Sequence, residues 1–83
     1  MAGISTKAQY FIRGEIKDET QKSLANVKMI FHSTGYIYYS GTYGGFGITS
    51  PNVSDTVTMS LEGYQPKTIL LDSRKENNLV LKM

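Results

Sequence analysis

The sequence predicts an all-β domain, an antiparallel or mixed Greek-key β-sandwich of about seven short strands. In residues 55–61 the apolar Val57, Met59 and Leu61 alternate with hydroxyl residues, which is the period of a strand with one buried face. Turn residues separate segments of this kind every eight to twelve residues or so. No segment of useful length has the apolar period of a helix.

The chain of 83 residues has room for one domain, which we expect to span residues 9–83. Residues 1–8 are polar and lack a period, so we expect a disordered arm or the remnant of a linker or tag. Because Met1-Ala2-Gly3 resembles an added start, we expect the chain to be a piece of a longer protein.

The first half of the domain contains three predicted strands. Residues 10–18 alternate in apolar character, and residues 27–32 repeat the pattern with Val27, Met29 and Phe31 on one face. Residues 33–35 form a turn, and residues 36–40 are rich in aromatic β-formers.

The second half contains the remaining predicted strands. Residues 41–47 include four glycines and predict a turn or a bulged hairpin tip, after which residues 46–49 resume as a short strand. Gly63 can supply the positive φ of a tight reversal between the strand at 55–61 and an apolar segment at 67–71. Residues 79–83 close the domain as a final alternating strand.

The alternation also predicts which side chains form the core. Tyr64, directly after Gly63, is expected to plug one end of this core. The predicted inward residues are Ile12, Ile16, Leu24, Val27, Met29, Phe31, Phe46, Val57, Met59, Leu61, Ile69, Leu79 and Leu81.

Composition excludes several functional classes. The net charge is only +2 and the nine Lys and Arg residues are scattered, which argues against a nucleic-acid partner. The longest apolar run is far shorter than a membrane span, so we do not expect the chain to cross a membrane. There is no cysteine, hence no disulfide, and no residue pattern predicts a cofactor.

The order of several short motifs resembles carboxypeptidase regulatory-like domains. Residues 12–18 (Ile-Arg-Gly-Glu-Ile-Lys-Asp), followed by residues 24–27 (Leu-Ala-Asn-Val), resemble the opening of these domains, although Ala25 and Asn26 stand where Pro and Gly are usual. Residues 40–46 keep the Gly-x-Phe half of the family's next turn and lack its acidic half. Asp55-Thr-Val, Gly63-Tyr64 and Leu79-Val-Leu are similar to its last three strands, so that the resemblance covers about residues 10–83.

The resemblance implies a transthyretin-like β-sandwich that serves as an accessory domain of a larger bacterial envelope protein. It therefore implies a periplasmic, outer-membrane or cell-surface location. The partners would be neighbouring domains of the parent chain or another envelope protein. The expected structural turn positions are Gly14, Gly44, Phe46, Gly63 and Tyr64.

No catalytic or metal site is predicted. His32 is the only histidine, and the alternation places it on the face opposite Phe31, whereas a metal site or a hydrolase needs several convergent partners. The serines lack the Gly-x-Ser-x-Gly context of a nucleophile. Residues 44–47 are rich in glycine but lack the Lys-Ser/Thr of a phosphate-binding loop, so turn formation explains them.

The feature that suggests a function is an aromatic cluster formed by Tyr36, Tyr38, Tyr39, Tyr43 and Phe46, of which the four tyrosines are the candidate binding residues. Tyr36 and Tyr38 share one strand face and Tyr39 takes the other, so one set of rings is expected outside the core. These rings suit a protein interface or a sugar-stacking platform, and cross-strand aromatic packing is the alternative. If they bind a partner, Tyr38→Ala or Tyr39→Ala should leave folding intact and abolish binding.

An open sandwich also leaves edge strands to which a partner can add a strand, and Pro66 indicates an edge or a strand entry. We therefore expect a non-enzymatic spacer or protein-interaction module. The alternative is a carbohydrate-binding module that uses the same tyrosines, and a hydrolase with His32 as its base is a third reading.

Overall fold

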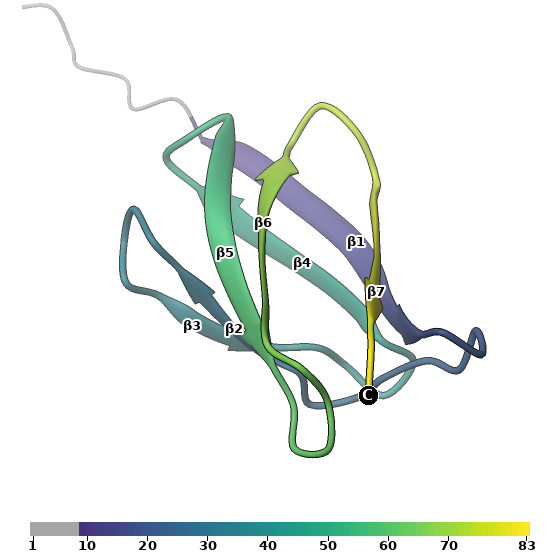
Figure 1. Cartoon of the computed structure of the whole chain (residues 1–83). Coiled ribbons are helices and arrows are strands. Elements are labelled where there is room, and N and C mark those ends of the chain that lie inside the picture. The colour runs from purple at the N-terminus through teal and green to yellow at the C-terminus, as the bar shows by residue number, and fades with distance from the viewer. Residues whose placement is uncertain (1–8) are drawn as a thin grey trace, which may run out of the picture.

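The computed structural model describes residues 9–83, and the predicted arm at residues 1–8 lies outside the described residues. The described chain is all β, as the sequence predicts (Figure 1). Its strands are β1 (Tyr10–Asp18), β2 (Lys28–Phe31), β3 (Ile37–Tyr39), β4 (Gly45–Ser50), β5 (Ser54–Ser60), β6 (Lys67–Asp72) and β7 (Asn77–Leu81).

The seven strands form two sheets of a small sandwich. One sheet has the order β4-β1-β7 and the other has the order β3-β2-β5-β6. The β1–β7 pair is parallel and the other pairs are antiparallel, so the sandwich is of the mixed type. The predicted hairpin of β5 and β6 is confirmed, and Gly63 has a φ of 89° between these strands.

The core lies between the sheets. Most of the predicted inward residues are buried, whereas Phe46, Leu61 and Ile69 are only partly buried and pack against the core. Ile48 and Leu71 are buried core residues that the prediction missed, and each lies two residues further along the inward face of β4 or β6 than a predicted residue. The buried apolar residues are Ile12, Ile16, Leu24, Val27, Met29, Phe31, Ile48, Val57, Met59, Leu71, Leu79 and Leu81.

The prediction of Gly14 and Phe46 as turn residues is wrong. Gly14 lies within β1 and is paired with Phe46 of β4 on one side and with Asn77 of β7 on the other. A Cβ atom on Gly14 would overlap the carbonyl oxygen of Asn77. Glycine is needed here because the backbones of β1 and β7 approach closely, a reason that can place glycine inside a strand.

Residues 41–47 do not form a hairpin tip, because β3 and β4 belong to different sheets. The segment crosses from one sheet to the other, and a turn is closed where the N–H of Gly44 donates to the carbonyl of Gly41 (2.9 Å). Gly44 has a φ of 77°, so its predicted turn role is confirmed.

Tyr64 packs against the core as predicted and also reaches a buried carboxylate. Asp18 accepts hydrogen bonds from the hydroxyl (2.6 Å) and the N–H (2.8 Å) of Thr20, from the N–H of Lys22 (3.0 Å) and from the Tyr64 hydroxyl (3.4 Å). These bonds, with that from the Thr20 hydroxyl first, lower the pKa of Asp18. Burial, together with the Asp18 charge, raises the pKa of Tyr64.

The β6–β7 turn is held by Asn77 and by an ion pair. The buried Asn77 amide donates to the carbonyls of Arg13 (2.9 Å) and Asp72 (3.0 Å), which ties the turn to β1. The Arg74 guanidinium donates to both carboxylate oxygens of Asp72 at 2.9 and 2.7 Å. These bonds lower the pKa of Asp72 to about 2.

The residues that the structure describes contain no helix long and apolar enough to cross a membrane.

The Asp72–Arg74 pair generates a prediction about pH. Because the folded pKa of Asp72 lies below its ordinary value of 3.8, the pair stabilises the fold above that pH, and its contribution is lost as the pH falls toward about 2. Arg74→Ala should raise the pKa of Asp72 toward 3.8, as measured by a carboxyl-carbon NMR titration. Lys75→Ala is the control and should raise it less, since Lys75 acts only through its charge. An unchanged Asp72 pKa in Arg74→Ala would contradict the assignment.

Candidate interaction surface

Four exposed aromatic and aliphatic side chains lie on β3 or in the segments directly before and after it. Tyr36 is 53% exposed, Ile37 50%, Tyr39 60% and Tyr43 82%. Tyr36 precedes the strand, Ile37 and Tyr39 lie within it, and Tyr43 lies in the crossover to β4. The structure therefore leaves three of the four predicted tyrosines largely open to solvent, and we call Tyr36, Ile37, Tyr39 and Tyr43 the β3 surface.

Tyr38 differs from the other tyrosines because it packs against the core. Its ring meets that of Phe31 edge to face at a centroid distance of 5.6 Å, and that of Tyr36 at 6.3 Å. Edge-to-face contacts of this kind stabilise aromatic pairs. Cross-strand packing therefore accounts for Tyr38, and Tyr36 is its exposed neighbour.

The backbone of β3 has unused hydrogen-bonding groups along its outer edge. The N–H of Phe31 donates to the carbonyl of Tyr36 (2.9 Å), and the N–H of Ser40 donates to the carbonyl of Val27 (3.1 Å). Since antiparallel ladders alternate, the N–H and C=O groups of Ile37 and Tyr39 point away from β2. Within residues 9–83, β3 pairs only with β2, so these groups can receive another strand.

A shallow depression of about 420 Å³ lies next to this edge. Lys28 connects the two features, because it is paired with Tyr39 on one side and with Ser60 on the other. Polar groups of Asn26, Lys28, Ser60 and Glu62 line the depression together with Leu61, Tyr64 and Pro66. The lining of the depression is more apolar than polar, and Tyr39 lies one strand away from it through its pairing with Lys28.

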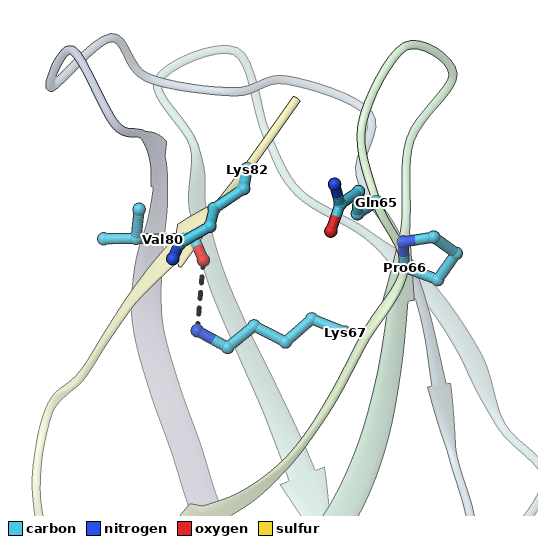
Figure 2. Close-up of a pocket in the computed structure, with 5 residues that line it drawn as sticks. All are labelled: Gln65, Pro66, Lys67, Val80 and Lys82. Carbon is cyan, nitrogen blue, oxygen red and sulfur yellow. Dashed lines mark hydrogen bonds between the residues drawn. The ribbon is translucent and has the colours of Figure 1, made fainter.

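On the opposite side of the sandwich, two hydrogen bonds link the start of β6 to the end of β7. Figure 2 shows the Lys67 side chain crossing toward β7, where its ammonium donates to the carbonyl of Val80 (3.1 Å). The N–H of Gln65 donates to the carbonyl of Lys82 (2.7 Å). These residues, with Pro66, line a cavity of about 260 Å³. Pro66 directly precedes β6, an edge strand, as predicted.

His32 hydrogen bonds to a hydroxyl group and not to a carboxylate. His32 is exposed, and its Nε2 atom hydrogen bonds to the hydroxyl of Thr58 (2.6 Å). The Asp55 carboxylate instead accepts a bond from the Ser33 hydroxyl (2.6 Å), so the carboxylate does not orient the imidazole. Among residues 9–83, no three His, Asp or Glu side chains gather into a group that could hold a metal ion.

Sequence reasoning missed two members of this region. Ile37 is one of them, and it shares the exposed face of β3 with Tyr39. Lys28 was counted only as a scattered charge. The alternation of residues 36–39 could have identified Ile37, whereas the place of Lys28 beside the depression depends on strand pairing.

The different packing of neighbouring tyrosines generates a prediction about stability. Tyr38→Ala should lower the free energy of unfolding by about 2 kcal/mol, because it removes apolar burial and the contact with Phe31. Tyr39→Ala is the matched control and should change it by less than about 0.5 kcal/mol, since the ring is exposed. Urea denaturation measures both values. Equal losses in the two variants would contradict the distinction.

A search of protein-family models and of curated proteins finds no match to this chain.

Proposed function

We propose that this chain is a non-catalytic interaction module that binds an extended segment of a partner protein along the edge of β3. The observation that carries the proposal is the coincidence of two features on two residues. Ile37 and Tyr39 direct free backbone groups outward, and their side chains are exposed together with Tyr36.

The physical basis is strand addition. A partner strand gains main-chain hydrogen bonds from an exposed edge, and the side chains around that edge select its sequence. Tyrosine provides a rigid contact area with a polar hydroxyl at its tip. This suits a binding surface that is exposed to water when no partner is bound. Because β3 is only three residues long, the rings of the β3 surface must supply much of the affinity.

The resemblance to carboxypeptidase regulatory-like domains supports a wider context for this activity. In that context the chain is an accessory domain and spacer of a larger bacterial envelope protein, and its partner is a neighbouring domain or another envelope protein. The seven-strand sandwich is compatible with this family's fold.

The proposed context predicts where the domain is found. An antibody raised against residues 9–83 should detect, in fractionated native cells, a protein much larger than 9.2 kDa in the envelope fraction. Detection only of a protein of this size in the cytosolic fraction would contradict the context while leaving the binding proposal open to its own test.

A second candidate is carbohydrate binding, favoured by the position of Tyr39 beside the depression that Lys28 and Ser60 line. An exposed ring can stack on a sugar while adjacent polar groups hydrogen bond to its hydroxyls. This function would use Tyr39 without using the free backbone groups of β3.

Binding can be tested with a phage-displayed library of random 12-residue peptides. Selected peptides should shift the backbone amide NMR signals of Ile37 and Tyr39, and Tyr39→Ala should weaken binding at least about tenfold. Leu70→Ala removes a side chain of similar exposure (61%) from β6 and serves as the control, which should bind normally.

The same titration separates the two candidates. Soluble glucan, xylan and mannan oligosaccharides that shift the Tyr39 ring signals, without shifting the outward amides of β3, would favour sugar binding. Peptides whose signals map elsewhere on the domain would overturn the proposed edge.

A further inference from the structure

The cavity between β6 and β7 is positively charged. It has a volume of about 260 Å³, and none of the residues that line it is acidic. β6 and β7 are edge strands of different sheets, so the cavity lies where no ladder joins the two described sheets. We call it the β6–β7 cavity, and its lining residues are Gln65, Pro66, Lys67, Val80 and Lys82.

The side chain of Lys67 is held in place from β7. Its ammonium donates to the carbonyl of Val80 at 3.1 Å (Figure 2). An ammonium has three N–H donors, so this bond leaves two donors for another group. The bond also orders a long side chain in the unbound protein. Less side-chain entropy is therefore lost when a ligand binds to Lys67.

Lys82 supplies a second positive charge. It directly follows β7 and lines the same cavity as Lys67, and Figure 2 shows both side chains extending toward Val80. Among residues 9–83 the one ion pair joins Arg74 to Asp72, so a carboxylate neutralises neither lysine. Two ammonium groups therefore line one small volume without a counter-charge.

The backbone carbonyls at the cavity already accept hydrogen bonds. The carbonyl of Val80 accepts the bond from Lys67, and the carbonyl of Lys82 accepts one from the N–H of Gln65 (2.7 Å). Pro66 has no N–H and adds only apolar surface. The free hydrogen-bonding groups of the cavity are thus mainly ammonium donors, which favour an anion.

We propose that the β6–β7 cavity binds a phosphate group. A phosphate monoester carries a charge of about −1.5 to −2 at pH 7, which matches the two ammonium groups. The planar fork of arginine suits a carboxylate, whereas this cavity has only lysines, which bind phosphate as point charges. The cavity is smaller than the range of about 300–1,000 Å³ that is typical of sites for drug-sized ligands, so it suits a single charged group.

The apolar part of the lining favours a phosphate group that is attached to carbon. The side chain of Val80 is 37% exposed, and Pro66 is exposed as well. The organic part of a phosphomonoester can cover these side chains, whereas inorganic phosphate leaves them in water. We therefore expect a small phosphomonoester to bind more tightly than inorganic phosphate.

An NMR titration of the full 83-residue chain at pH 7 tests the proposal, with inorganic phosphate and glycerol 3-phosphate as probes and sodium chloride keeping the ionic strength constant. The backbone amide signals of Lys67, Val80 and Lys82 should shift and saturate. We expect a dissociation constant of about 1 mM, because salt screens exposed charges. Equal affinities for the two probes would overturn the choice of a phosphomonoester in favour of the free ion.

Charge-removing variants separate this site from general attraction to a basic chain. Lys67→Met and Lys82→Met keep the unbranched stem, lose the charge, and should each raise the dissociation constant at least about fivefold. Lys75→Met removes the same charge from an exposed position outside the cavity and should bind as the parent chain does. Lys82→Met leaves the bond between Lys67 and Val80 intact, so it tests the site even if Lys67→Met unfolds the domain.

Three results would overturn the proposal: shifts that do not saturate, shifts that lie away from the cavity, or an equal loss of binding in Lys75→Met. The outcome is independent of peptide binding, because β3 and β6 are opposite edges of their sheet.

Discussion

The fold depends on the close approach of β1 and β7 at Gly14. β1 is the middle strand of its sheet, with β4 on one side and β7 on the other. A side chain at residue 14 would overlap the backbone of Asn77. The parallel β1–β7 pair joins the first and last strands of the domain. The Asn77 amide strengthens the same junction through its bond to the carbonyl of Arg13. A chain without cysteine therefore holds its first and last strands together through backbone contact and one buried amide.

The closed junction makes the two sides of the sandwich different. On the β6–β7 side, the Lys67 side chain and the N–H of Gln65 donate to carbonyls of the last strand and its continuation, which links these two edges at one end. On the other side, β3 leaves backbone groups outward, and exposed rings lie beside its edge. The surfaces available to partners follow from this asymmetry. In the interior of the described residues, every buried polar side-chain atom has a hydrogen-bond partner.

Much of the fold could be predicted from the sequence, because two-residue periodicity depends only on which residues are apolar. It predicted all seven strands and most of the core, together with the turn at Gly63 and the outward direction of His32. The errors concern Gly14 and the segment 41–47. A glycine has the same appearance in a sequence whether it serves a positive φ, as Gly44 does, or a close backbone approach, as Gly14 does.

The candidate surfaces were less accessible to sequence reasoning. The sequence by itself determined an all-β chain with a tyrosine cluster, since composition and alternation are local properties. Only the tertiary structure decided that Tyr38 packs on Phe31 while Tyr39 remains exposed, and that β3 and β4 are edges. The reason is physical, because whether a strand has one neighbour or two depends on pairing between residues far apart in the chain. The residues of a single strand do not specify which other strand pairs with it.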